Sequence, residues 1–328
     1  MSLVSDGEPT ELHNRSLESG SFIATRIDSQ QPIVGETVEL FNQPFTKVVF
    51  ADEKVAFFLP GSDVETSRSA FDHEIETIRS VVAQLSDLYP NSSVSHNIVL
   101  CPEELYTQRF REKIERMGDD PAPWIDWSEG DIEFVEGIGA VFCVRSGAFF
   151  QSEGDRLRFF AHELAHPLTY QVSKIFSWSS PENMLALAEG LVEADARISF
   201  SIQARSDMAF SSRFIQNLDP NQLALPAEID SEQYDHPSFI SATVSLNPGY
   251  ASCLLWFYGM AISIGSGTSL REKYQDGRRQ IIAIASSVET RSDFKQLLFS
   301  QIGFDYDKNA VDRNFLLKSR ENFLSEFI

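Results

Sequence analysis

Two histidines four positions apart, with a glutamate directly after the first, stand in the segment FFAHELAH, which ends at His166. Residues four apart lie on one face of an α-helix, about one turn from each other, so both imidazoles can reach one metal ion. Glu163 stands where a carboxylate can take a proton from a metal-bound water and return it to a leaving amine. The pattern His162-Glu163-x-x-His166 therefore predicts a catalytic metal site.

The same segment has an apolar face. Leu164 points away from both histidines by about half a turn, and Leu157, Ala161 and Leu168 share its side. We expect this face to pack against the core while the opposite face coordinates the metal. The alternative is a solvated helix face that carries two histidines and no metal.

A catalytic zinc site needs a third protein ligand and an open position for water. Downstream, Ser179–Glu182 (SSPE) has the spacing of a capping box with proline in the first turn, which predicts the start of a helix. This helix carries Glu189-Gly190, then Glu193 and Asp195. These three acidic residues are the candidates for the third ligand.

The HExxH motif followed by a Glu-Gly pair on the next helix resembles the gluzincin group of zinc metallopeptidases, which includes thermolysin-like and aminopeptidase N-like enzymes. The resemblance implies one Zn²⁺ ion bound by His162, His166 and Glu189, with Glu193 or Asp195 as the next candidates for the third ligand. It also implies that Glu193 orients a ligand histidine through its other ring nitrogen.

Two further segments are similar to parts of the same group. Asn247–Gly259 resembles the helix that follows the site in aminopeptidase N-like enzymes, where a tyrosine near the helix start stabilises the oxyanion. Tyr250 is the candidate for that role, and His236 is the alternative donor. The strand expected at Gly137–Val144 resembles the edge strand that pairs with an extended substrate backbone.

Two departures from the group stand beside these similarities. Pro167 follows His166 directly, and proline disfavours helical geometry in the preceding residue and lacks a backbone donor. We therefore expect the helix to kink or end there. No GxMEN-like exopeptidase motif precedes the HExxH helix, which favours endopeptidase action over removal of N-terminal residues.

The resulting expectation is a zinc-dependent metallopeptidase that hydrolyses peptide bonds in a peptide or protein substrate. The alternative is a catalytically silent metallopeptidase-like module that binds a protein. A third interpretation is a zinc hydrolase of another substrate class, because HExxH specifies the metal and the base but not the bond that is cleaved.

The apolar patterns predict the elements that position these residues. Strands are expected at residues 48–50, 55–59, 94–101 and 137–144, with helices at 71–85 and 103–117, a loop at 119–130, and mainly helices after residue 152. The order predicts an α+β fold. With the resemblance, it implies a zincin-like arrangement, in which the active-site helix lies between an N-terminal twisted mixed sheet with helices and a C-terminal mainly helical region.

The expected boundaries divide the chain into three parts. Residues 1–45 are polar and lack a clear period, so we expect a flexible or loosely docked arm. Residues 46–166 form the α/β region that ends in the HExxH helix. Residues 167–328 form the helical region that carries the third zinc ligand.

Composition excludes several classes of partner. The chain of 328 residues has a net charge of −21, which repels phosphate backbones, so no nucleic-acid partner is expected. No apolar stretch reaches the roughly 20 residues that are needed to cross a bilayer. We therefore expect a soluble protein that does not insert into a membrane. The first residues lack the features of a Sec signal, which predicts a cytoplasmic location or export by a route that needs no Sec signal peptide.

Overall fold

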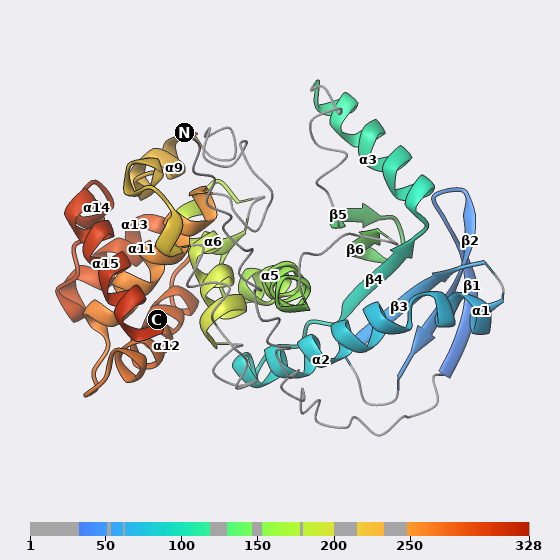
Figure 1. Ribbon diagram of the computed structural model, residues 1–328, viewed down its shortest axis with the longest axis horizontal. Helices are drawn as coiled ribbons and strands as arrows, with labels where there is room; N and C mark the ends of the chain where they lie inside the picture. Colours follow the sequence, from blue (N-terminus) through green and yellow to red (C-terminus); the bar gives the residue numbers. More distant parts are fainter. Residues whose placement is uncertain are drawn as a thin grey trace, which may run out of the picture.

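The N-terminal half of the chain builds a mixed β-sheet and the C-terminal half is mostly helical, which makes the fold α+β as predicted (Figure 1). The structure is a computed structural model. It describes residues 33–50, 54–61, 63–118, 130–145, 153–177, 180–199, 215–232 and 248–327. Figure 1 shows helix α5 (Glu153–Val172) between the sheet and the C-terminal helices.

The sheet has six strands in the order β1-β2-β3-β4-β6-β5. Strands β3, β4 and β6 run parallel to one another, and the remaining neighbours are antiparallel. The strands expected at residues 48–50 and 55–59 are confirmed as β2 and β3, which pair antiparallel. The strands are β1 (Ile33–Leu40), β2 (Gln43–Val49), β3 (Val55–Pro60), β4 (His96–Cys101), β5 (Gly130–Val135) and β6 (Gly139–Arg145).

Two sequence predictions about the sheet are wrong. The polar arm was expected to extend to residue 45, but residues 33–40 form β1. Most side chains of β1 are exposed. Most of the strand therefore lacks the alternation of apolar and polar residues that identifies a half-buried strand. The strand expected to be an edge, now β6, pairs on both sides, with β4 and with β5. In the described part of the sheet, the edge at this side is β5, for which no strand was predicted.

Both faces of the sheet are covered, so that alternate residues of each strand enter different cores. Phe57, Ile98 and Phe142 pack with helix α2 (Asp72–Leu88) and with α5. Phe58, Val99 and Cys143 face the opposite way and pack with helix α3 (Glu103–Met117). The predicted helices at 71–85 and 103–117 are therefore confirmed, and α2 is preceded by a short helix, α1 (Val64–Ala70).

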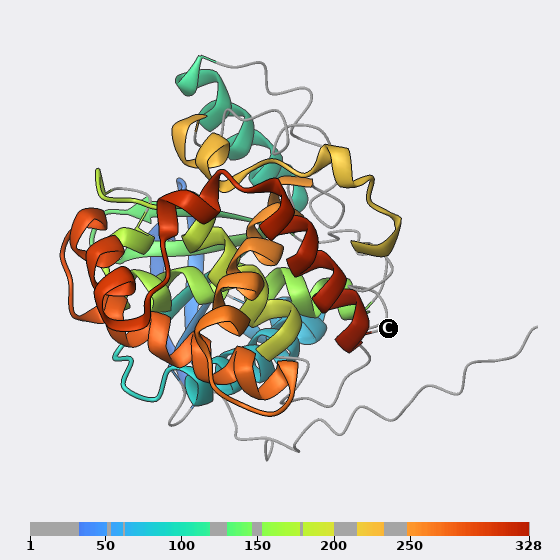
Figure 2. The same ribbon diagram turned by 90° about the vertical axis from the view of Figure 1, so that its left-hand side faces the viewer.

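The C-terminal helices form a third core around α11 (Pro248–Ile264), in which every residue from 251 to 261 is buried. A helix that is apolar on all sides belongs inside a protein, and Figure 2 shows this region facing the viewer. No helix in the described ranges is long and apolar enough to cross a membrane. The other elements are η1 (Lys174–Phe176), α6 (Leu185–Ala194), η2 (Asp195–Ser199), η3 (Pro220–Gln222), α9 (Pro226–Glu232), α12 (Leu270–Ser286), α13 (Arg291–Leu297), η6 (Leu298–Ile302), α14 (Tyr306–Ala310) and α15 (Arg313–Phe327).

His96, the first residue of β4, makes the stability of the fold depend on pH. Burial lowers the pKa of His96 from 6.5 to about 4, and the positive charge of Lys54 contributes to this shift. The unfolded chain therefore binds a proton between pH 6.5 and pH 4 that the folded chain excludes, so this contribution to stability is present above pH 6.5 and lost as the pH falls. We expect a loss of about 2 kcal/mol in the free energy of unfolding between pH 7 and pH 5 from this residue.

Urea unfolding at the two pH values measures this effect. The His96→Gln variant should lose less stability than the wild type on going from pH 7 to pH 5, whereas His73→Gln, at an exposed position on α2, should retain the wild-type difference. An unchanged pH dependence in His96→Gln would show that the buried imidazole is not its source.

Candidate metal centre

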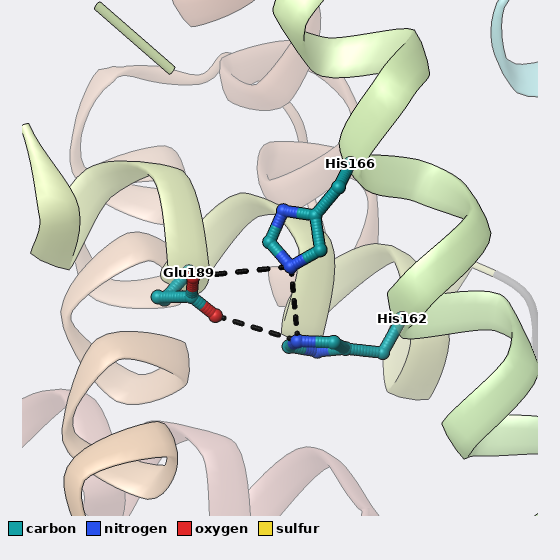
Figure 3. A group of neighbouring side chains, drawn as sticks. All are labelled: His162, His166 and Glu189. Carbon is teal, nitrogen blue, oxygen red and sulfur yellow. Dashed lines mark hydrogen bonds and ion pairs between the residues drawn. The ribbon is translucent and has the colours of Figure 1, made fainter. Parts of the chain in front are cut away.

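The two histidines of the HExxH motif lie one turn apart on α5 and are both buried (Figure 3). Their rings are 4.8 Å apart between centroids, and the two Nε2 atoms lie 3.2 Å from each other. On the opposite side of α5, Leu157, Ala161 and Leu164 enter the core under the sheet, as the sequence predicted. One face of the helix therefore packs while the other presents two imidazoles.

Pro167 does not end this helix, which continues to Val172. Proline removes the donor that would bind the carbonyl four residues earlier, but it lies between two buried residues that hold the helix in place. The hydroxyl of Thr169 donates to the carbonyl of His166 over 2.9 Å. Of the two outcomes expected at Pro167, a kink or an end of the helix, the end is therefore wrong.

The third candidate ligand comes from α6, which begins later than predicted. Residues 180–184 form a turn, in which Ser180 Oγ accepts a hydrogen bond from the Glu182 amide, and the helix starts at Leu185. Ser179, the other half of the expected capping box, lies outside the described residues. The amide of Ala186 in the first turn donates instead to Asp230 Oδ1 on α9, 2.8 Å away. A carboxylate from a distant helix thus replaces the local cap.

Glu189 is fully buried on α6 and faces both imidazoles (Figure 3). Its Oε2 lies 3.4 Å from His162 Nε2 and its Oε1 lies 3.8 Å from His166 Nε2. Four ligands placed tetrahedrally at zinc-ligand distances of 2.0–2.1 Å are separated by about 3.3 Å. The spacing of the two nitrogens and the carboxylate therefore fits one zinc-sized ion between them.

Protonation of the two histidines is unequal, which shows that the cluster favours one positive charge. Burial alone would lower the pKa of His162, but hydrogen bonds to Glu189 and Glu193 outweigh it and raise the value to about 10. Burial lowers the pKa of His166 to about 4. The negative charge of Glu189 acts to raise this pKa, and the positive charge of His162 acts to lower it. A metal cation would take the position of the His162 proton, so binding releases a proton and weakens as the pH falls.

Gly190, next to Glu189, lets α6 and α11 approach each other closely. A Cβ at this position would lie 2.4 Å from the carbonyl oxygen of Cys253 and 2.7 Å from Cβ of Phe257. We expect Gly190→Ala to lower the free energy of unfolding by about 1–3 kcal/mol, because the helices must separate to admit the methyl group. Chemical denaturation of the metal-free chain measures this loss.

Gly303→Ala is the comparison for that variant. Gly303 has a φ of 79° and no atom within 4 Å of the added Cβ. Gly303→Ala therefore measures the cost of backbone strain without any steric contact. If Gly190→Ala left both stability and metal affinity unchanged, the close helix contact would not matter for the position of Glu189.

The two other acidic candidates are not turned toward the histidine pair in the way that Glu189 is. Glu193 contacts the far side of the His162 ring, with its Oε1 3.3 Å from Nδ1. Asp195 is held by Arg278, whose Nε and Nη2 donate to it over 2.6 and 2.8 Å, and by the hydroxyl of Tyr89 over 2.5 Å. The structure therefore brings Glu189 to the two histidines and Glu193 behind His162.

Glu163 and Tyr250 both lie beside the histidines. Glu163 is half-buried on α5, and its negative charge raises the pKa of His162. Tyr250, in the first turn of α11, places its ring edge-on to His162 with centroids 5.3 Å apart. Burial, together with the negative charges of Glu189 and Glu163, raises the pKa of Tyr250 well above 10, so its hydroxyl remains a donor. His236, the alternative donor, lies outside the described residues.

Tyr170 was missed by the sequence analysis. It lies one turn after His166 on α5, with ring centroids 5.7 Å apart, and burial and the charges of Glu189 and Glu163 raise its pKa. The signal was present, because residues 162, 166 and 170 repeat every four positions and so share one helix face.

Comparison with protein-family models, with curated proteins and with solved structures finds no match to this chain. What the centre can do therefore follows from its own geometry and chemistry.

Proposed function

We propose that this chain is a zinc-dependent metallopeptidase with a gluzincin-type site and a zincin-like fold. The observation that carries the proposal is the buried cluster of His162, His166 and Glu189, whose ligand atoms all lie within 4.8 Å of one another. Two imidazoles, one carboxylate and a position left for water are the donor set of a catalytic zinc site. The base and a phenol donor lie beside this cluster.

A zinc ion bound there would polarise the scissile carbonyl and lower the pKa of a bound water. Glu163 accepts the proton of the attacking water and passes it to the leaving amine. The hydroxyl of Tyr250 donates a hydrogen bond to the carbonyl oxygen as negative charge develops. In other enzymes, one such donor lowers the activation barrier by about 3–4 kcal/mol. Glu193 holds the His162 ring from its other nitrogen.

A strand edge next to the site supports an extended peptide as substrate. In the described part of the sheet, β5 is the outer strand beyond β6. Phe142 of β6 packs against Phe159 and Phe160, which directly precede the HExxH motif on α5. An extended chain can add to such an edge through backbone hydrogen bonds. An internal segment can bind in this way without an anchored terminus, so we favour endopeptidase action.

Metal content and an unbiased peptide-library digest test the proposal together. We expect the purified full-length chain to bind one zinc ion, to cleave library peptides, to lose cleavage with a chelator and to regain it with added zinc. Absence of bound zinc would refute the proposal. Stoichiometric zinc without any cleavage would instead support the catalytically silent protein-binding module.

A further inference from the structure

Two buried arginines bind the carboxylate that lies behind His162. Arg158 is on α5, one turn before His162, and its Nη1 donates to Glu193 Oε1 over 2.9 Å. Arg197 is on η2, one turn after Glu193, and its Nε donates to Glu193 Oε2 over 2.6 Å. The exposed fractions of the three side chains are 5%, 3% and 0% for Arg158, Arg197 and Glu193, so water does not compete for these contacts.

Each oxygen of Glu193 therefore has an arginine partner, and Oε1 also lies 3.3 Å from His162 Nδ1. A carboxylate held at both oxygens keeps a single rotamer. In this rotamer Glu193 lies against His162 Nδ1, which favours a proton on that nitrogen and leaves the Nε2 lone pair for a metal ion. The cluster also joins α5, which carries both histidines, to the segment that carries Glu189.

Stability alone is a weak reason for this arrangement. Burying two arginines and one glutamate requires desolvation of three charges, and such clusters are often replaceable by apolar residues without loss of stability. Both arginines donate to Glu193, the carboxylate that lies against His162 Nδ1.

We propose that Arg158 and Arg197 are positioning residues, which hold Glu193 against His162 Nδ1 and so preorganise the metal centre before the ion binds. This inference rests on the proposed function in that it takes zinc as the ion, but it does not require turnover. In this role the two arginines increase metal affinity by fixing the orientation of His162, and they do not contact the substrate.

Arg278 on α12 supplies a matched control, because it binds a carboxylate on the same segment as Glu193. It is also buried, and it binds Asp195, two residues after Glu193, through two hydrogen bonds of 2.6 and 2.8 Å. Among the contacts described, that carboxylate joins Tyr89, Ser199 and Arg278 and not a ligand histidine. Arg278→Gln should therefore lower stability and leave zinc affinity unchanged.

Zinc affinity of the full chain, measured by competition with a chromophoric chelator, is the main readout. We expect Arg158→Gln and Arg197→Gln each to weaken Zn²⁺ binding by about 10- to 100-fold. We also expect them to alter the visible absorption of the Co²⁺-substituted protein and the NMR signal of the His162 Nδ1 proton. Arg158→Lys, which keeps the charge without the guanidinium fork, should recover part of the lost affinity.

Wild-type affinity in both glutamine variants would overturn the inference, and so would an equal loss of affinity in Arg278→Gln. If Arg158→Gln does not fold, Arg158→Lys replaces it, and full wild-type affinity in the lysine variant overturns the inference. A wild-type chain that binds zinc but cleaves no peptide would refute only the peptidase. A wild-type chain that binds no zinc would refute both proposals.

Discussion

Replacing Glu163 by glutamine is expected to reduce peptide hydrolysis by about 10²- to 10⁴-fold while the metal stays bound. Glutamine keeps the size of the side chain and can still accept a hydrogen bond, but it cannot take the proton of the attacking water. Glu163 is not one of the three residues whose ligand atoms converge, so its replacement leaves the donor set intact. Metal affinity should therefore change little.

Steady-state rates on a cleaved library peptide, with metal content determined on the same samples, check this outcome. Glu112→Gln changes an exposed glutamate on α3, which accepts from Gln108 over 2.9 Å, and should leave the rate unchanged. Hydrolysis at the wild-type rate by a metal-loaded Glu163→Gln variant would remove Glu163 from the mechanism. Added zinc should not restore activity to this variant, because it lacks the base and not the ion.

Glu189→Gln is expected to act on the ion itself and to weaken zinc binding by at least about 100-fold, since an oriented anionic ligand is exchanged for a neutral amide. Glu189 is fully buried and lies 3.4 and 3.8 Å from the two Nε2 atoms, so no water replaces it without rearrangement. Activity should fall with the metal content and return in part at high zinc concentration.

Chelator competition and the dependence of the rate on zinc concentration measure these two effects. Unfolding of the metal-free variant shows separately whether the chain still folds. The matched comparison is Glu104→Gln on α3, which removes an exposed carboxylate and should change neither quantity. Wild-type zinc affinity in a folded Glu189→Gln chain would exclude Glu189 as a ligand, and with it the proposed centre.

Local patterns were sufficient for the part of the centre that lies on one helix. His162 and His166 are four residues apart, and a helix brings such positions together whatever surrounds it. The apolar residues of α5, α2 and α3 recur at helical spacing, so their buried faces were predictable. The β2–β3 hairpin followed from two apolar segments around a short turn.

Other elements have no complete local signal. Strand β1 is mostly exposed at the edge of the sheet, and its side chains alternate between polar and apolar only over its last four residues, Thr37 to Leu40. The order of β5 and β6 depends on which strand pairs with β4, and that pairing links residues more than 40 positions apart. The start of α6 depends on Asp230, because Glu182 of the expected capping box lies in a turn before the helix.

The sequence by itself determined the pair of histidines and the adjacent glutamate, because their positions depend on spacing along one helix. It also determined the α+β class, which depends on the order of strands and helices along the chain. Only the tertiary structure decided which carboxylate meets the histidines and which one lies behind them. Glu189, Glu193 and Asp195 lie within seven residues of one another and are chemically alike. Glu189 meets two imidazoles, Glu193 meets His162 and two arginines, and Asp195 meets Arg278 and Tyr89. Except for Arg197, which lies one turn after Glu193, these partners come from elements that are distant in the sequence and meet only when the chain is folded.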